Sequence, residues 1–155
     1  MILAIDPGNI ESAYCLIDDD YKPIKFGKIY NQELLELLNG ITSEKVVIEM
    51  ISSYGMAVGK SIFDTIFWIG RFYEVSDHWS KCYLMYRKDV KMNLCNTMRA
   101  KDANIIQALI DRFAYGVPNR GKGYKKSPGY FYGFKADIWQ AYALGVSYLD
   151  KIKKV

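Results

Sequence analysis

The sequence opens with Met1-Ile2-Leu3-Ala4-Ile5-Asp6-Pro7-Gly8, a short apolar run that ends in a carboxylate and a Pro-Gly turn. A run of this length that is stopped by a turn signal predicts a strand buried on both faces. Aspartate is a poor strand former, and an ionised carboxylate at the edge of a core is costly unless a cation compensates it. Asp6 therefore either caps the turn through its side chain or belongs to a site.

A second apolar run ends in the same way. Val46-Val47-Ile48-Glu49 also places an acid at its end, and glutamate lacks the turn-forming tendency that explains many aspartates. Two buried strands that each present a carboxylate indicate that the two acids share a cation.

Composition and length are those of a single globular domain that covers residues 1–155. Half of the residues are hydrophobic and a quarter are charged, with a formal net charge of +4. No apolar stretch is long enough to cross a membrane, and a strand that begins at Met1 leaves no room for a signal peptide. The three cysteines lack disulfide or zinc spacing, so we expect a protein of the reducing cytoplasm.

The order of the expected elements predicts a mixed sheet. After the first run we expect strands at 12–17, 23–30, 44–50 and 81–86, and helices at 31–38, 60–76, about 97–113 and 135–151. The first three strands form an antiparallel meander, and the first and fourth can lie side by side and parallel. Asp6 and Glu49 would then meet at strand ends, where α/β sheets carry their sites.

The expected helix 60–76 has more apolar residues than one buried face requires. Ile62, Ile66, Ile69 and Tyr73 are among them, and Gly70 permits close approach of another helix. The excess indicates either a helix enclosed within the domain or a second apolar contact, for which a homodimer interface is the natural candidate.

The stretch from Pro118 to Gly129 has the most unusual composition. It contains three glycines, two prolines, no acid and four cations, namely Arg120, Lys122, Lys125 and Lys126. We expect a mobile loop that is either a soluble linker or a contact for a phosphate backbone, with Tyr124 available to stack on a base.

Asp137 stands in the first turn of the expected last helix. The helix dipole favours an anion there, which is one explanation for this residue. The same position also suits a third carboxylate directed at Asp6 and Glu49. Three acids with basic segments nearby describe a site for a phosphate and for Mg²⁺, and two such ions can activate a water to hydrolyse a phosphodiester.

Four places in the chain together resemble the RuvC family of Holliday junction resolvases. They are Ile2 to Gly8, Val46 to Glu49, the pair Val90-Lys91 with Arg99 to Asp102, and Lys135-Ala136-Asp137. The resemblance implies an α/β fold of the ribonuclease H-like type, with a five-stranded mixed sheet flanked by helices. It also implies a homodimer that cleaves four-way DNA junctions in paired nicks with Mg²⁺, two ions per site, for which Mn²⁺ substitutes. Divergent phage-encoded resolvases look more similar than the bacterial type, which implies the cytoplasm of a bacterial host.

The resemblance assigns roles to residues of this chain. It implies catalytic roles for Asp6, Glu49, Asp137 and Lys101, and metal ligation by Asp6, Glu49, Asp137 and Gln140. With the basic stretch, it predicts DNA contacts at Lys91, Lys101, Arg120, Lys122, Tyr124, Lys125 and Lys126.

The chain departs from the family pattern at Ala13, where glycine is usual, and at Gln140, where the last helix normally carries a second acid. Glutamine offers a carbonyl oxygen to a metal but no charge. Either three carboxylates suffice, or another acid such as Asp102 substitutes, or the chain is catalytically impaired.

Beside a junction-resolving endonuclease, the alternatives are a non-catalytic junction-binding protein and a nuclease of the same fold that cleaves RNA–DNA hybrids or other branched DNA.

Overall fold

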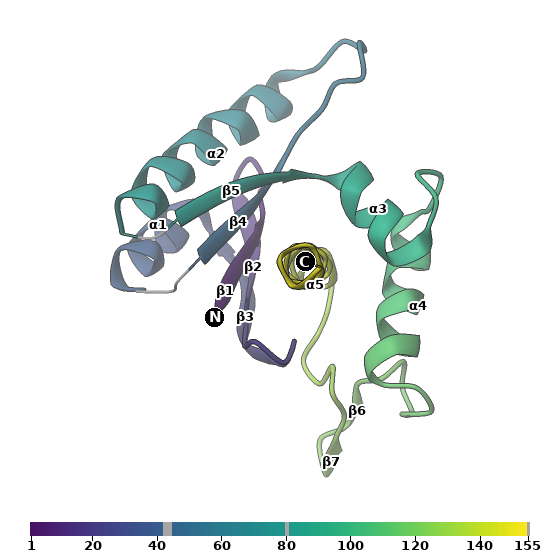
Figure 1. Ribbon diagram of the computed structural model, residues 1–155. Helices are drawn as coiled ribbons and strands as arrows, with labels where there is room; N and C mark the ends of the chain where they lie inside the picture. The colour runs from purple at the N-terminus through teal and green to yellow at the C-terminus, as the bar shows by residue number, and fades with distance from the viewer. Residues whose placement is uncertain (42–44, 80, 155) are drawn as a thin grey trace.

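A five-stranded sheet forms the centre of the computed structural model, which describes residues 1–41, 45–79 and 81–154 (Figure 1). The strands are β1 (Ile2–Asp6), β2 (Glu11–Ile17), β3 (Pro23–Tyr30), β4 (Lys45–Met50) and β5 (Lys81–Tyr86), in the order β3-β2-β1-β4-β5. β1 pairs antiparallel with β2 and parallel with β4. The predicted mixed sheet is confirmed, although Glu44, the expected start of the fourth strand, lies outside the described residues.

Helices cover both faces of this sheet. α1 (Asn31–Gly40) and α2 (Lys60–Trp79) lie on one face, and α3 (Arg87–Cys95), α4 (Asp102–Phe113) and α5 (Ile138–Lys153) lie on the other (Figure 1). None of the described helices has the length and apolar character needed to cross a bilayer.

α3 is a helix that the sequence analysis did not predict. Val90 is its buried residue, so the segment lacks the apolar periodicity that marks a helix. Asn96 ends it in a left-handed conformation, with its N–H bonded to the carbonyl oxygen of Met92. The next helix therefore begins at Asp102 rather than at 97 or 99, and the last begins at Ile138 rather than at 135.

β1 contributes to two separate cores, as the prediction of a strand buried on both faces requires. Leu3 and Ile5 pack in the core beneath α1 and α2, whereas Ile2 and Ala4 pack in the core around α5. Residues 138–149 of α5 are all buried. Gly145 permits this close packing, because a Cβ there would lie 3.2 Å from the Cβ of Ala4.

The exposed apolar face of α2 differs from the expected one. Ile69 is only 2% exposed and packs toward the sheet, so its assignment to an interface was wrong. Phe63, Ile66 and Phe67 are large apolar residues of this helix whose side chains are exposed. The reason is the helical phase, which turns Ile69 inward.

The basic stretch is not a featureless loop but a small hairpin of β6 (Gly123–Tyr124) and β7 (Ser127–Pro128). The N–H of Gly123 donates to the carbonyl oxygen of Pro118 at 3.0 Å, and a Cβ on Gly123 would lie 2.4 Å from the backbone nitrogen of Gly129. The glycines thus allow the base of the hairpin to close, while Lys125 and Lys126 are exposed at its tip.

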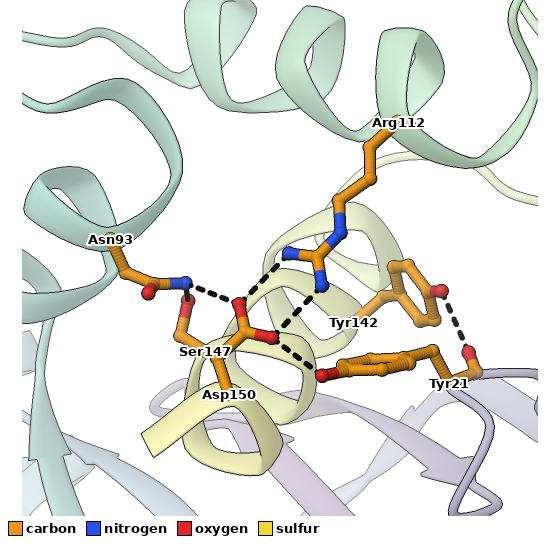
Figure 2. Close-up of polar contacts among 6 residues, drawn as sticks. All are labelled: Tyr21, Asn93, Arg112, Tyr142, Ser147 and Asp150. Atoms are coloured by element: carbon orange, nitrogen blue, oxygen red, sulfur yellow. Dashed lines mark hydrogen bonds and ion pairs between the residues drawn. The ribbon is translucent and has the colours of Figure 1, made fainter. Parts of the chain in front are cut away.

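A polar network on Asp150 ties the helices of the α5 face together (Figure 2). Asp150 accepts two hydrogen bonds from Arg112 of α4, one from Asn93 of α3 and one from the Tyr21 hydroxyl. Tyr142 donates from α5 to the carbonyl oxygen of Tyr21 at 2.7 Å. The network therefore fixes α3 and α4 against α5, and α5 against the turn between β2 and β3.

Candidate functional site

Asp6 and Glu49 lie beside each other at the ends of β1 and β4. The parallel register pairs Ile5 with Ile48, so the two acids follow at the same level of the sheet. Burial and then the charges of Glu49 and Asp137 raise the pKa of Asp6 well above its ordinary value. The predicted meeting of the two strand-end acids is therefore present, and Asp137 is within electrostatic reach of Asp6.

The turn after β1 is held by residues other than Asp6. Ser12 Oγ accepts from the N–H of Gly8 at 3.0 Å and donates to Asn31 Oδ1 at 2.6 Å, and Asn31 Nδ2 donates to the Gly8 carbonyl oxygen. A Cβ on Gly8 would lie 2.2 Å from the Glu11 carbonyl oxygen, so the turn requires glycine. Because Ser12 and Asn31 hold the turn, the Asp6 carboxyl group is not needed to stabilise it and can interact with Glu49.

Asp137 occupies the position before α5 without capping the helix. Its side chain makes no capping hydrogen bond, although its place at the N-cap still suits the helix dipole. Instead, its carboxylate accepts from Lys28 Nζ of β3 at 2.8 Å. Lys28 was not identified from the sequence, because edge strands commonly carry lysine for solubility.

Arg87 is the second cation of the site, and sequence reasoning gave it no role. Its Nη1 lies 3.3 Å from Glu49 Oε1, and its Nη2 donates to Asp102 Oδ1. Its position directly after β5, the neighbour of β4, is the signal that points to it. Arg87 therefore bridges Asp102 and Glu49, and the Asp102 carboxylate is already paired with a cation.

Lys28 and Arg87 each bind one of the two outer acids. In the part of the chain that the structure describes, no group of three or more His, Cys, Asp or Glu side chains is placed to hold a metal ion as it stands. The structure brings Asp6 and Glu49 into contact and Asp137 near them. A shared metal at these acids therefore remains a prediction.

Gln140 provides an observation that fits a cation. The residue is 6% exposed, and its Oε1 is buried without a hydrogen-bond partner among the described residues. An unsatisfied buried carbonyl costs about 1–3 kcal/mol, which a ligand can recover. Gln140 lies one helical turn after Asp137, and carboxylate and carbonyl oxygens are the donors that Mg²⁺ prefers. The donor set of Asp6, Glu49, Asp137 and Gln140 thus fits a hard divalent ion.

The predicted DNA-contacting residues occupy two regions. Lys91 lines a pocket with Tyr54, and Tyr54 also lines the pocket beside Glu49 and Arg87. Lys101 is exposed immediately before α4. The others lie on the hairpin segment: Arg120, Lys122, Tyr124, Lys125 and Lys126.

A further basic pocket, which the sequence analysis missed, joins the hairpin to the segment before α5. Lys122 lines it together with Tyr132 and Lys135. Lys135 precedes Asp137 by two residues, so this pocket connects the hairpin to the third acid.

No family model and no curated protein matches the sequence. Among solved structures, Thermus thermophilus RuvC matches with a TM-score of 0.70 at 12% identity, covering 98% of this chain and 95% of that chain. T. thermophilus RuvC in complex with a Holliday junction substrate matches with a TM-score of 0.64 at 12% identity, covering 99% of this chain and 95% of that chain. The predicted ribonuclease H-like fold of the RuvC type is confirmed.

Proposed function

We propose that this chain is an endonuclease that cleaves four-way DNA junctions by Mg²⁺-dependent phosphodiester hydrolysis. The observation that carries the proposal is the Asp6–Glu49 pair at adjacent strand ends of a RuvC-like fold, with Asp137 in electrostatic reach. The neighbouring structure with a bound Holliday junction substrate supports branched DNA as the substrate class.

Asp6, Glu49 and Asp137 would hold the metal, with Gln140 Oε1 as a neutral fourth donor. When bound, divalent ions supply the charge that activates a water and stabilises the leaving oxygen, and Mn²⁺ substitutes for Mg²⁺. Burial and the charges of Glu49 and Asp137 raise the pKa of Asp6 well above its ordinary value. Because a metal binds the ionised carboxylate, protons would compete with it at Asp6 and metal affinity should rise with pH.

The basic residues position the DNA. Lys91 and Lys101 contact phosphates near the acids, and the hairpin cations contact them farther along the duplex arm. Tyr124 is 58% exposed at the hairpin and is available to stack on an unpaired base. Such contacts recognise the backbone and shape of a junction rather than its sequence.

A homodimer places two active sites on the two symmetry-related strands of a junction. The exposed apolar side chains of Phe63, Ile66 and Phe67 on α2 supply the interface. Ile66 and Phe67 also line a shallow groove together with Leu35, Gly70 and Val75, which extends the apolar surface.

A nicking assay on synthetic four-way junctions with Mg²⁺ tests the proposal, with linear duplex and RNA–DNA hybrid as controls. We expect paired nicks in the junction and little cleavage of either control. Gln140 in place of an acid favours a second candidate, a junction-binding protein without catalysis. Tight junction binding with no nicks in Mg²⁺ or Mn²⁺ would establish that candidate, and preferential cleavage of the hybrid would establish a different nuclease.

A further inference from the structure

Arg87 lies between an inner and an outer carboxylate. Glu49 and Arg87 are 16% and 25% exposed, whereas Asp102 is 68% exposed. The Arg87 guanidinium donates to Glu49 Oε1 at 3.3 Å and also to Asp102 Oδ1. It is therefore shared between a buried carboxylate at the acid site and a solvent-exposed carboxylate outside it.

The guanidinium and a metal ion would compete for the same oxygens. Arg87 supplies positive charge to acids that otherwise repel one another, and a divalent ion on Glu49 would supply it more strongly. Arginine cannot lose its proton in a protein, so it cannot respond by becoming neutral. It has to move. A cavity of about 170 Å³, lined by Tyr54 and Tyr86 beside Glu49 and Arg87, provides room for this movement.

We propose that Arg87 is the resident counter-ion of the acid site, which occupies Glu49 until a divalent cation displaces it, and that Asp102 retains the displaced guanidinium. This inference rests on the proposed function, because it assigns a regulator to the same metal site. Asp102 is thus a positioning residue that acts through Arg87 and favours metal entry. It replaces the idea of Asp102 as a direct metal ligand.

Titration of the full chain without DNA tests the inference, with Mg²⁺ measured by calorimetry and Mn²⁺ by electron paramagnetic resonance. Arg87→Gln should lower the Kd by about threefold to tenfold, because the competing cation is gone. Asp102→Asn should raise the Kd by a similar factor, because Arg87 then binds Glu49 alone. In the Arg87→Gln background, Asp102→Asn should have little effect, since the two residues act as one unit.

Arg71→Gln is the matched control. Arg71 is an exposed arginine on α2, over the ring of Trp68 and on the opposite face of the sheet. Its removal changes the net charge equally and should leave the Kd unchanged. A comparable drop in Kd with Arg71→Gln would show a general charge effect and overturn the inference.

The remaining outcomes are also decisive. A higher or unchanged Kd in Arg87→Gln would overturn the inference, as would an equal effect of Asp102→Asn in both backgrounds. If Arg87→Gln fails to fold, the exposed Asp102→Asn variant still tests the inference, and tighter or unchanged binding there rejects it. A parent chain that binds no divalent ion and makes no nicks rejects the proposed function itself, whereas a parent that does both confines any failure to Arg87.

Discussion

Lys28 and Asp137, 109 residues apart in the chain, form an ion pair at 2.8 Å that joins edge strand β3 to the residue before α5. Arg87 pairs with Glu49 in the same region. Each outer acid of the candidate site therefore has a cation at hydrogen-bond or ion-pair distance. Asp6 instead lies beside a second acid, and burial together with the charges of Glu49 and Asp137 raises the pKa of Asp6.

Asp6→Asn should abolish metal-dependent nicking and leave the metal-free chain folded. Because burial and the charges of Glu49 and Asp137 raise the pKa of Asp6, its ionisation opposes folding. The stability of the parent should therefore fall as pH rises from about 4, the unfolded value, through the folded pKa of Asp6. The variant should lack this fall. Thermal unfolding in EDTA across this pH range measures it, and persistent nicking by the variant would refute the metal role.

Gln140→Asp should add a fourth carboxylate at a buried position. Without metal, we expect a lower Tm, because a buried charge without a partner is unfavourable. With Mg²⁺, we expect a larger rise in Tm than in the parent and nicking at least as fast. Gln107→Asp, at an exposed position of α4, controls for the added charge. An absent or smaller Mg²⁺ response in Gln140→Asp would count against Gln140 as a ligand position.

Neutralising the four hairpin cations, Arg120, Lys122, Lys125 and Lys126, should weaken junction binding. The slope of log K against log salt should flatten by about one for each phosphate that a protomer no longer neutralises. Mg²⁺ affinity should be retained, because the hairpin carries no carboxylate. Lys45 and Lys81 begin β4 and β5, at the edge of the sheet away from the acids, and replacing them should alter neither junction binding nor Mg²⁺ affinity. A salt slope that stays the same would exclude the hairpin from the DNA interface.

Asp150→Asn should destabilise the chain by about 2–4 kcal/mol, because it leaves Arg112 without its ionic partner beside the core (Figure 2). Burial works to raise the pKa of Asp150, but hydrogen bonds from Arg112, Asn93 and Tyr21 lower it well below the usual value. Its stabilising effect should therefore be present above about pH 4 and be lost as pH falls further.

Urea unfolding of Asp150→Asn and the parent at neutral and acidic pH measures this effect. Asp64→Asn, which breaks an exposed pair with Lys60 on α2, is the control and should change stability little. Equal decreases in the free energy of unfolding of the two variants would show that the Asp150 network stabilises the chain no more than an exposed ion pair does.

Replacing Phe63 and Phe67 with Ser should convert a dimer into monomers. The two side chains are 62% and 65% exposed in the single chain, so their loss should not lower the Tm of the protomer. Light scattering after size exclusion measures the mass, and the junction assay should show single rather than paired nicks. Tyr115→Ser, at an 85% exposed position, is the control. A monomeric parent that makes paired nicks would contradict the interface.

The sheet and its acids were predictable because apolar runs define strands. The acids at the ends of two such runs met because the strands are parallel neighbours. Lys28 was not predictable as a counter-ion, because its contact depends on side-chain reach across the sheet edge. Arg87 follows β5 directly, which is a signal, but its pairing with Glu49 also depends on side-chain reach from α3. α3 itself escaped notice because Val90 alone does not produce a periodic pattern.

The basic stretch from Pro118 to Gly129 shows what amino-acid composition alone does not predict. Its composition correctly excluded a core element, but glycine content alone does not distinguish a loose loop from a tight hairpin. Gly123 has a φ of +64° and backbone within 3 Å of the missing Cβ, so the same residue type that suggested mobility enables a close turn. The helical phase of α2 was similarly not predictable from its apolar content, and Ile69 was predicted on the exposed face although it packs toward the sheet.

Because α5 is both the centre of one core and the element that follows Asp137, the order of synthesis controls when the site can exist. β1 and β4 leave the ribosome long before residues 138–149, whose burial completes the α5 face of the sheet. Until α5 docks, the central strands lack their main cover on that face and the third acid has no fixed position. A nascent or partly folded chain therefore holds at most the Asp6–Glu49 pair. Assembly of the candidate site is thereby coupled to the docking of the C-terminal helix, a contact of high sequence separation from β1.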